Sequence, residues 1–387
     1  MSRPNRLLIS LVSDQRMQNV LPVFQGGLKF DSVLLIASTQ RGAINPRYRH
    51  IAADLARAMK NQVAVRLHPK PVDPYDPEST RTVLGRILEQ FGEDIESVIN
   101  FTGGTKPMAV GAYLAAEDHG LPQLYVDTFN ERFLFYEPSG VMRIVDFHLE
   151  NVTIPIYLKA HHRNIHQKQT RQHQFQPQEL AIAKALIHLG ERGVSAADAL
   201  HTRTFQKNSA MRTKIPRSLK LALEETNFFS QGDLTHAGEE YFRAGRWLEA
   251  FTYQLLLDAK VFDDILGPVI FESPSRHDDQ TSVTNEIDVM ALHHGKLGLI
   301  ECKTRLRRRD RTGGQASGAQ DALGKLKALQ DVSAGLFGKG FVVTAQFGGK
   351  LSPAVYERAR EYRLTIIPRA QLMSLPDLIY RGLSPRR

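Results

Sequence analysis

The chain has 387 residues, more than a single hydrophobic core usually supports, so two or more domains are expected. It carries 50 Lys and Arg against 41 Asp and Glu, and the net charge of +9 favours polyanionic partners. No apolar run approaches the roughly 20 residues of a membrane span, the apolar stretch 7–12 is too short for a secretory signal, and the single cysteine, Cys302, rules out an internal disulfide or a cysteine-based structural zinc site. We therefore expect a cytoplasmic protein.

Residues 1–152 are expected to form an α/β domain. Compact apolar runs predict buried strands at Leu7–Val12, Ser32–Ala37, Val63–Leu67 and Ser97–Phe101. Between and after them we expect helices at Tyr48–Asn61, Ser79–Phe91 and Pro107–His119, then a strand and a hairpin at Leu124–Asp127, Arg132–Tyr136 and Met142–Asp146. Because strands alternate with helices, the sheet should be mostly parallel, with ligand sites at the carboxyl ends of its strands.

A loop that contains two glycines joins the fourth predicted strand to the helix after it. Its residues are Thr102, Gly103, Gly104, Thr105 and Lys106. Glycines here allow backbone N–H groups to approach a phosphate, the helix N-terminus favours an anion, and threonine and lysine side chains add donors. The loop matches neither the Walker A pattern nor Gly-x-Gly-x-x-Gly. It indicates a phosphate site, although glycine pairs also form ordinary strand-to-helix turns.

Residues 153–245 are expected to link the first domain to the last. The stretch 155–178 contains several histidines mixed with Gln, Lys and Arg, without apolar periodicity, and we interpret it as a solvated linker rather than a metal site. Helical patterns follow between 178 and 245, with a short segment at 228–234 that could form a wing. Two interpretations stay open: a winged helix, and a helical connector that packs the two ends together, of which we prefer the second.

The last segment, 246–387, is again expected to be α/β. The predicted helices lie at Trp247–Lys260, Ala319–Gln330 and Pro353–Glu361, and the predicted strands near 268–272, 285–292, 297–303, 340–344 and 364–367. The strands 285–292 and 297–303 flank His294 and Gly295, a natural two-residue hairpin turn because glycine readily adopts positive φ.

The turn determines which residues of this hairpin face each other. Paired residues across an antiparallel hairpin have a constant sum of residue numbers, so Asp288 should lie across from Glu301 and Glu286 across from Lys303. Side chains alternate along a strand, so these four residues should share one face. The opposite face carries only apolar residues and Cys302, as expected of a core face.

Two carboxylates placed opposite each other repel, and each raises the pKa of the other unless a cation lies between them. Asp288, Glu301 and the backbone carbonyl of Cys302 would offer hard oxygen ligands to Mg²⁺ or Mn²⁺. Lys303, on the same face as Glu301, could position and help deprotonate the attacking water while the metal lowers that water's pKa. The alternative is a surface ion-pair ladder in which Glu286 pairs with Lys303.

A cluster of arginines directly follows the second strand of the hairpin. Its members are Arg305, Arg307, Arg308, Arg309 and Arg311. A run of charges is usually a solvated loop, but beside a candidate phosphodiesterase centre it favours phosphate contacts. Contacts to phosphate carry no information about sugar or base, so cleavage with little sequence preference is expected, and DNA and RNA are not distinguished.

The hairpin resembles the PD-(D/E)xK nuclease superfamily, whose motif is an acid, a spacer and then Glu-x-Lys. Here Asp288 is followed by twelve residues and then by Glu301, Cys302 and Lys303. The superfamily often contributes a further acid from the preceding helix, and Glu249 stands at that position. The resemblance therefore implies a restriction-endonuclease-like α/β domain that hydrolyses phosphodiesters with a metal, with Glu249 assisting the metal or its water.

The first domain, with its T-G-G-T-K loop, resembles the CARF domains of CRISPR-associated proteins, which are Rossmann-like and bind cyclic oligoadenylates. The loop after the first strand lies where that family places another ligand-contacting loop, and the residues after the second strand form a third candidate. The added ligand candidates are Ser13, Asp14, Gln15, Ser38 and Thr39.

Together the two ends look like the CARF nuclease effectors of type III CRISPR systems. This resemblance implies a homodimer that binds cyclic tetraadenylate across its two-fold axis and responds with DNA or RNA cleavage in antiviral defence. Two other functions remain open: a ligand-responsive DNA-binding regulator with a non-catalytic C-terminal domain, and a restriction or repair nuclease without cyclic-nucleotide control.

Overall fold

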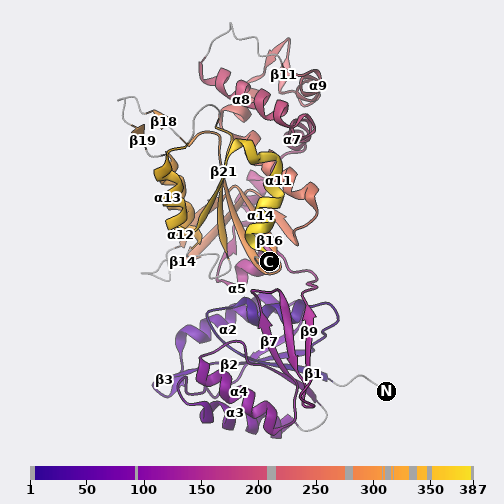
Figure 1. Cartoon of the computed structure of the whole chain (residues 1–387), viewed down its shortest axis with the longest axis vertical. Helices are drawn as coiled ribbons and strands as arrows, with labels where there is room; N and C mark the ends of the chain where they lie inside the picture. The colour runs from indigo at the N-terminus through magenta and orange to yellow at the C-terminus, as the bar shows by residue number, and fades with distance from the viewer. Residues whose placement is uncertain are drawn as a thin grey trace. The chain divides into compact units, whose positions relative to one another are not determined.

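The computed structural model describes residues 5–91, 95–206, 215–274, 282–306, 308–309, 315–316, 318–330, 338–346 and 351–384. The chain divides into two compact units, residues 1–164 and residues 165–386, each with its own core (Figure 1). Among the described residues, no helix is long and apolar enough to cross a membrane.

A seven-stranded sheet forms the centre of the first unit. Its strand order is β5-β2-β1-β6-β7-β8-β9, with neighbours parallel from β5 to β7 and antiparallel from β7 to β9. The strands are β1 Asn5–Leu11, β2 Ser32–Ile36, β5 Ala64–Leu67, β6 Ile95–Asn100, β7 Gln123–Asp127, β8 Arg132–Tyr136 and β9 Met142–Asp146. The expected α/β fold with a mostly parallel sheet is therefore confirmed.

Helices cover both faces of this sheet (Figure 1). On one face, α3 (Pro77–Phe91) and α4 (Lys106–Asp118) pack their apolar residues against β1, β2 and β6. The remaining helices of the unit are α1 Met17–Val20, a 3₁₀ turn Leu21–Phe24, α2 Pro46–Met59 and α5 Ile154–Ala160, and a small hairpin is formed by β3 Thr39–Gln40 and β4 Ala43–Ile44. The central strands β1 and β2 are buried on both faces, which explains their continuous apolar runs.

The candidate ligand loops meet where the order of strands reverses. From β1, the chain continues to its neighbour β2 on one side, while β6 lies on the other side of β1. Crevices at the carboxyl ends of strands on the two sides of such a reversal are the usual ligand sites of open α/β sheets. The loop after β1 and the loop after β6 both begin at this edge.

The predicted solvated linker at 155–178 is wrong at its beginning, which is a buried helix, whereas the second half is helical in part but largely exposed. It contains α5, whose Tyr157 and Leu158 are fully buried, and α6 (Gln167–His173). The apolar residues of α5 are followed by many histidines and glutamines, so the sequence pattern did not indicate a buried helix. α5 is buried because it packs against α2, which is far away in the sequence.

The second unit joins a helical layer to a mixed sheet around one core. The helical layer contains α7 Pro177–Leu189, α8 Glu191–Gln206, α9 Arg217–Glu225 and α10 His236–Arg243, with a hairpin of β11 Phe229–Ser230 and β12 Asp233–Leu234 between α9 and α10. The hairpin lies where the sequence suggested a wing. Buried residues of these helices and of the sheet belong to one hydrophobic cluster, so this part packs directly on the C-terminal α/β fold.

The sheet of the second unit has the order β13-β16-β17-β20-β21. Its strands are β13 Asp264–Leu266, β16 Val289–His293, β17 Lys296–Lys303, β20 Lys339–Thr344 and β21 Leu364–Ile367. Helices α11 Arg246–Ala259, α12 Gly318–Leu329, α13 Pro353–Glu361 and α14 Leu375–Leu383, and a 3₁₀ segment Arg369–Ser374, surround it. Further strands, β14 Val269–Pro274 and β15 Ser282–Ile287, pair with each other, the short β10 (Asn164–Ile165) adds to β14, and β18 Arg308–Arg309 pairs with β19 Gln315–Ala316.

Candidate active site

The predicted hairpin forms with the predicted register. His294 and Gly295 make its turn with φ of 47° and 74°, the positive values that a two-residue turn of this kind requires. Five residue pairs follow from it, from His293 with Lys296 to Val289 with Ile300. The apolar face is also as expected, because the residues at 289, 291, 300 and 302 belong to the core.

The predicted pairing of Asp288 with Glu301 is wrong in one respect, because the hairpin ladder stops one residue earlier, at Val289 and Ile300. Asp288 lies at a bend between β15 and β16, outside the ladder, and its Oδ2 accepts a hydrogen bond of 2.6 Å from the backbone N–H of Cys302. Glu286 does not pair with Lys303: it belongs to β15, pairs with Ile270 of β14 and is exposed. The chain changes sheets at Asp288, a change that a pattern of alternating residues cannot reveal.

Glu301 is almost completely buried yet surrounded by charge. Its side chain is 1% exposed, and its Oε1 accepts a 2.7 Å hydrogen bond from Nζ of Lys303. Burial alone would lower the pKa of Lys303, but the neighbouring carboxylates of Glu301 and Asp288 outweigh burial and raise it. Lys303 is therefore an ammonium ion at neutral pH, well suited to an anionic partner.

Asp288 and Glu249 are carboxyl groups whose ionisation is opposed by their surroundings. Burial raises the pKa of Asp288 well above its usual value, and the charges of Glu301 and Glu249 add to this, while Lys303 and the Cys302 N–H oppose it. Burial also raises the pKa of Glu249 to about 7, with Arg246 and Lys303 acting in the opposite direction. The predicted acids are thus brought within electrostatic reach of one another.

The residues present fit a divalent cation. Asp288 and Glu301 are buried and Glu249 is partly buried, and the charge of Glu301 acts on both of the others. Burial and this repulsion destabilise the charged forms of Asp288 and Glu249. A cation between Asp288 and Glu301 would remove this penalty and take the hard oxygen ligands that Mg²⁺ and Mn²⁺ prefer. Carboxyl groups with perturbed pKa values cluster at functional sites.

Arg246 connects Glu249 with the helical layer. Its guanidinium donates to both carboxylate oxygens of Glu179 at the start of α7, at 2.8 and 3.3 Å, and to the carbonyl of His173 at 2.6 Å. It also forms a 3.6 Å ion pair with Glu249, one turn further along α11. Glu249 is therefore held in place by a residue that the sequence did not single out.

Lys325 is a second cation at Glu301 that sequence reasoning missed. Its Nζ lies 3.1 Å from both carboxylate oxygens of Glu301. Lys325 is on α12, and no spacing relates it to the Glu-x-Lys motif. The amphipathic pattern of α12 places it beside the buried Leu326 and could have indicated that it lies near the sheet, but not which residue it contacts.

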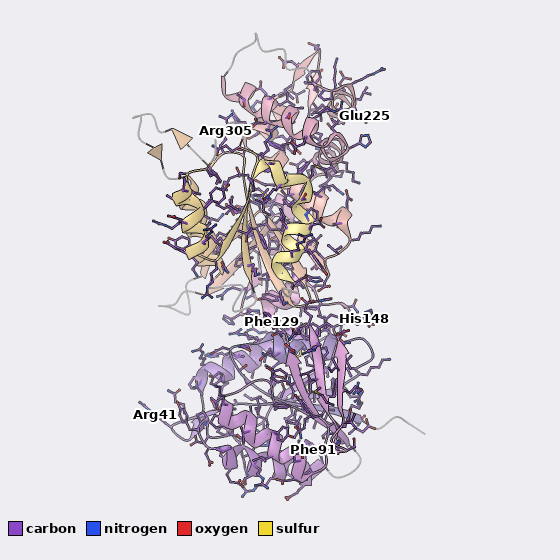
Figure 2. The ribbon with its side chains drawn as sticks, viewed as in Figure 1. Arg41, Phe91, Phe129, His148, Glu225 and Arg305 are labelled. Atoms are coloured by element: carbon purple, nitrogen blue, oxygen red, sulfur yellow. The ribbon has the colours of Figure 1, made fainter. Side chains whose placement is uncertain are left out.

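The predicted arginine cluster is described only in part. Arg307 and Arg311 lie outside the described residues, and Arg305 is the member whose side chain the structure describes. Arg305 is exposed and donates a 2.7 Å hydrogen bond to Oγ1 of Thr202 on α8 (Figure 2). Arg305, two residues after the end of β17, is thus an exposed cation that contacts the helical layer.

In the first unit, the glycine loop lies directly against the end of β1. A Cβ on Gly103 would lie 2.2 Å from the carbonyl oxygen of Leu11 and 3.3 Å from Oγ of Ser13, so only glycine fits there. Gly104 has a φ of +75°, which also favours glycine. In the described part of the chain, the backbone N–H groups of Gly103 and Gly104 meet no acceptor, and the buried Oγ of Ser13 has no hydrogen-bond partner.

The two threonines of the loop have structural partners. Oγ1 of Thr102 donates to Oδ1 of Asn100 at 2.6 Å and accepts from the N–H of Val126 at 2.7 Å. Thr105 caps α4 by accepting from the N–H of Met108, and its hydroxyl donates to the carbonyl of Pro74. The loop therefore presents to a ligand its backbone N–H groups and the exposed Lys106 rather than the threonine hydroxyl groups.

The other candidate ligand residues lie in loops that are held in place by contacts within the domain. Asp14, after β1, forms a 2.7 Å ion pair with Arg47 at the start of α2. Ser38 is buried and pairs with Val72 through an isolated bridge, and Oγ1 of Thr39 donates to the carbonyl of Ala43 across the β3–β4 hairpin.

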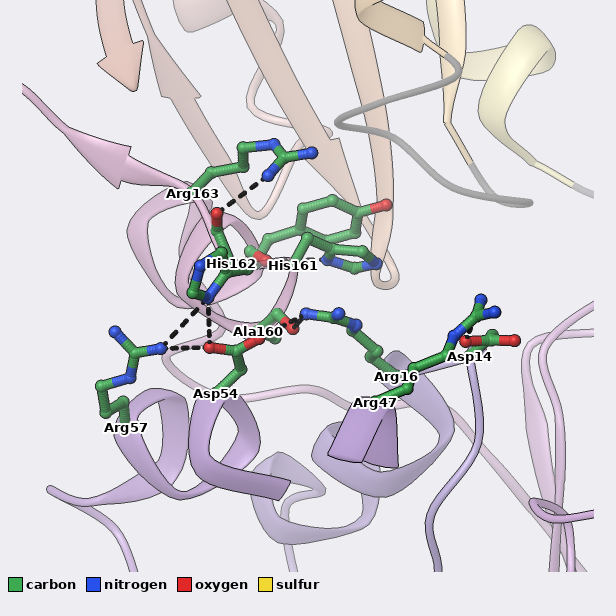
Figure 3. Close-up of polar contacts among 10 residues, drawn as sticks. Asp14, Arg16, Arg47, Asp54, Arg57, Ala160, His161, His162 and Arg163 are labelled. Carbon is green, nitrogen blue, oxygen red and sulfur yellow. Dashed lines mark hydrogen bonds and ion pairs between the residues drawn. The ribbon is translucent and has the colours of Figure 1, made fainter. Parts of the chain in front are cut away.

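Directly after the β1 loop, Arg16 enters a buried cluster around Asp54 of α2. Figure 3 shows Arg16, Arg57 and His162 converging on this carboxylate, which is 1% exposed; Arg16 reaches it at 2.8 Å and Nδ1 of His162 at 2.8 Å. Arg16 also donates to the carbonyl of Ala160 at 2.5 Å. The cluster therefore ties the β1 loop and α2 to the end of α5.

Two family models match the chain. The model of the Card1 CARF domain matches residues 7–157, and the model of the Card1-like endonuclease domain matches residues 238–381. The chain thus combines a Card1-type CARF domain with a Card1-like endonuclease domain. The resemblance drawn from the T-G-G-T-K loop and from the acid–spacer–Glu-x-Lys pattern is thereby confirmed at both ends, and with it the N-terminal CARF domain and the C-terminal nuclease domain.

Solved structures share this fold over the whole chain. Protein VC1899 from Vibrio cholerae has 19% identity and a TM-score of 0.72, over 98% of this chain and 99% of that chain. Can2 from Sulfobacillus thermosulfidooxidans, solved in complex with cyclic tetra-adenylate, has 21% identity and a TM-score of 0.68, over 98% and 99%. A type III CRISPR defence DNA nuclease activated by cyclic oligoadenylate has 18% identity and a TM-score of 0.60, over 100% of this chain but 53% of that chain. No curated protein matches.

Proposed function

We propose that this Card1-like protein is a metal-dependent endonuclease that cleaves DNA, RNA or both with little sequence preference, and that cyclic tetraadenylate bound by the CARF domain activates it in type III CRISPR defence, in the cytoplasm. The observation that carries the catalytic part is the buried carboxyl cluster of Asp288, Glu301 and Glu249 with Lys303 against Glu301. The activator is suggested by the CARF domain and by the ligand of the Can2 structure.

Each catalytic residue has a defined task in this proposal. Asp288, Glu301 and the backbone carbonyl of Cys302 would hold Mg²⁺ or Mn²⁺, which when bound lowers the pKa of a coordinated water and polarises the phosphate. Lys303 orients the attacking water and stabilises negative charge that develops on the phosphoryl group. Glu249, whose pKa is raised to about 7 by burial, accepts or relays the proton that this water loses.

The ligand site is proposed at the reversal of strand order in the CARF domain. The free backbone N–H groups of Gly103 and Gly104, the N-terminus of α4 and the exposed Lys106 provide donors and positive charge for a phosphate. The unpartnered Oγ of Ser13 lies beside them, and we include Asp14, Gln15, Ser38 and Thr39 as lining residues from the neighbouring loops. Thr102 and Thr105 would shape the loop through their internal hydrogen bonds.

We further propose that the CARF domain dimerises through an exposed apolar face next to this loop. α4 presents Val110, Tyr113 and Leu114, with exposed fractions of 52%, 38% and 38%, just beyond Lys106. The outer strands continue the face with Tyr125, Met142 and Ile144. Apolar patches of this kind usually mark interfaces, and a two-fold dimer would bring two glycine loops to one ring-shaped ligand of two-fold symmetry.

The test is a matrix of cleavage reactions with the full-length protein. Supercoiled DNA, single-stranded DNA and RNA are each incubated with Mn²⁺, Mg²⁺ or a chelator, with and without cyclic oligoadenylates of three, four and six units. We expect cleavage that needs both the metal and the four-membered ring. Cleavage that is equally fast without any cyclic oligoadenylate would instead support a nuclease without ligand control.

Two variants separate the halves of the proposal. Glu301→Gln should abolish cleavage while binding of cyclic tetraadenylate is retained, and Lys106→Ala should weaken that binding while cleavage at saturating activator survives. Metal-independent, sequence-specific binding to duplex DNA without cleavage would favour the regulator instead. Light scattering of a Val110→Asp variant tests the apolar face, because a charge there should convert a dimer into a monomer.

A further inference from the structure

Two ammonium groups compete for a single buried carboxylate in the nuclease domain. Nζ of Lys303 lies 2.7 Å from Oε1 of Glu301, and Nζ of Lys325 lies 3.1 Å from Oε1 and 3.1 Å from Oε2. The ammonium of Lys325 therefore bridges both oxygens of a side chain that is only 1% exposed. Lys325 itself is 43% exposed, so its ammonium can also reach solvent.

The position of Lys325 is determined by close packing of α12 on the sheet. Ala322, Leu323 and Leu326 are buried on the underside of α12. A Cβ on Gly340 would lie 2.3 Å from Leu364 and 3.0 Å from Leu326, so the absence of a side chain at Gly340 allows α12 to approach β20. β20 runs parallel to β17 with Val342 paired to Glu301. Lys325 directly precedes Leu326 on α12, and from there its ammonium reaches Glu301.

We propose that Lys325 is a second catalytic cation of this nuclease, one that neutralises Glu301 before the metal binds and contacts the scissile phosphate afterwards. The proposal rests on the proposed function, because it requires Glu301 to be a metal ligand. Glu301 would have to offer to a metal the same oxygen atoms that Nζ of Lys325 now contacts, so the ammonium would leave the carboxylate when a metal is bound. The flexible four-carbon stem then allows the ammonium to turn toward a phosphodiester oxygen beside the metal.

This exchange has a clear energetic reason in each state. Without the metal, a buried carboxylate next to Asp288 needs a compensating cation, and Lys303 alone contacts only one of its oxygens. During hydrolysis, the water oxygen bonds to phosphorus while its proton passes to Glu249, the bond from phosphorus to the leaving oxygen breaks, and negative charge accumulates on the phosphoryl and leaving oxygens. A preorganised ammonium at such oxygens typically contributes a factor of roughly 10² to the rate.

The proposal predicts opposite changes in metal affinity and in rate. In Lys325→Met, the metal no longer competes with an ammonium for Glu301, so Mn²⁺ measured calorimetrically without substrate should bind several-fold more tightly. Cleavage at saturating Mn²⁺ and activator should nevertheless fall about 10- to 100-fold, because the phosphate contact is lost. Lys327→Met, on the same helix, is the matched control and should leave both quantities unchanged. Lys325→Arg keeps the charge and should recover part of the rate.

Other outcomes would overturn the proposal. Unchanged cleavage of Lys325→Met at saturating Mn²⁺ would mean that Lys325 only stabilises the metal-free protein, which thermal unfolding with a chelator would then show as a lower Tm. Weaker Mn²⁺ binding by this variant would contradict the competition. If Lys325→Met does not fold, Lys325→Gln takes its place with the same expectations. Failure of the proposed function looks different: wild-type protein would bind no Mn²⁺, or would cleave as well after Glu301→Gln.

Discussion

Each unit of the protein buries a carboxylate, but the surroundings of the two are opposite. In the CARF domain, Asp54 stands alone among the cations Arg16 and Arg57 and the imidazole of His162 (Figure 3). In the nuclease domain, Asp288 shares its buried site with Glu301 and Glu249, whose charges raise its pKa well above the usual value after burial has already done so. Asp54 is therefore surrounded by positive charge, whereas Asp288 lies among negative charges.

The contrast distinguishes an ion cluster with a structural role from the site that we propose to hold a metal. Asp54 has all its partners within the domain, so its charge holds the β1 loop, α2 and the end of α5 together. In the nuclease domain, Glu301 is paired with Lys303 and Lys325, but burial and neighbouring carboxylates raise the pKa values of Asp288 and Glu249, and a bound divalent metal would stabilise their charged forms. Burial alone therefore says little about function, whereas the balance of charge around the buried group is decisive.

The largest effect should come from removing the Glu301–Lys303 pair. Glu301→Gln and Lys303→Met are each expected to reduce activated cleavage by at least about 100-fold, because metal binding and the orientation of the attacking water are lost. Rates on single-stranded DNA and RNA at saturating Mn²⁺ measure the effect. Asp54→Ser, in the other domain, is the comparison and should leave most of the cleavage activity intact. If this variant is folded at the assay temperature and binds the activator normally but loses as much cleavage activity, the two buried carboxylates do not differ in function.

The next effect concerns stability and has opposite signs in the two domains. Asp54→Asn should lower the free energy of unfolding by about 3–5 kcal/mol, because it leaves Arg16 buried without its counter-charge. Urea unfolding monitored by hydrogen exchange in α2 and α5 measures it. An unchanged midpoint would mean that solvent replaces the ion cluster without cost.

Asp288→Asn should instead stabilise the metal-free protein by about 1 kcal/mol, since it removes a buried like charge and keeps an oxygen for the Cys302 N–H. In the wild-type protein, Mn²⁺ at 100 times its dissociation constant should raise the free energy of unfolding by about 2.7 kcal/mol and thereby raise the Tm. The Asp288→Asn variant should lose this metal-dependent rise in Tm. A lower Tm without metal would show that Asp288 is a structural residue like Asp54.

The two domains should also respond to pH in opposite directions. Burial lowers the pKa of His161 to about 4 from 6.5, so the folded CARF domain binds fewer protons than the unfolded chain between these values, and its stability falls as pH drops from 6.5 to 4. The loss should be about 2–3 kcal/mol. Hydrogen exchange of α5 as a function of pH should reveal it, and His161→Asn should remove it.

In the nuclease domain, burial raises the pKa of Glu249 from 4.5 to about 7, so the folded state binds more protons in this window and gains stability as pH falls from 7 to 4.5. In a chelator, protection of α11 against hydrogen exchange should increase over this range by about 3 kcal/mol or less. Glu249→Gln should abolish the slope. If the wild-type protein shows no slope, Glu249 is stabilised as a carboxylate and belongs with Asp54 rather than with Asp288.

Much of this protein could be predicted from local pattern. The apolar runs of β1, β2 and β6 and the alternation in the hairpin depend on burial of neighbouring residues, which leaves a period in the sequence. The turn at His294 and Gly295 has a geometry that determines register, and five pairs follow it. Glu301 and Lys303 therefore share a face as expected, because two positions apart on one strand always do.

What only tertiary structure decided are the contacts between elements. The change of sheet at Asp288, the position of Lys325 over Glu301 and the link from Arg246 to Glu179 join residues with no constant spacing. The helix α5 also appeared only with its packing partner α2. Periodicity and turns in the sequence thus determined the α/β character of both ends and the Glu-x-Lys strand, because these patterns are local, and the resemblance of the motifs added the CARF and nuclease folds. The charges around that strand come from distant elements, because only packing brings them together.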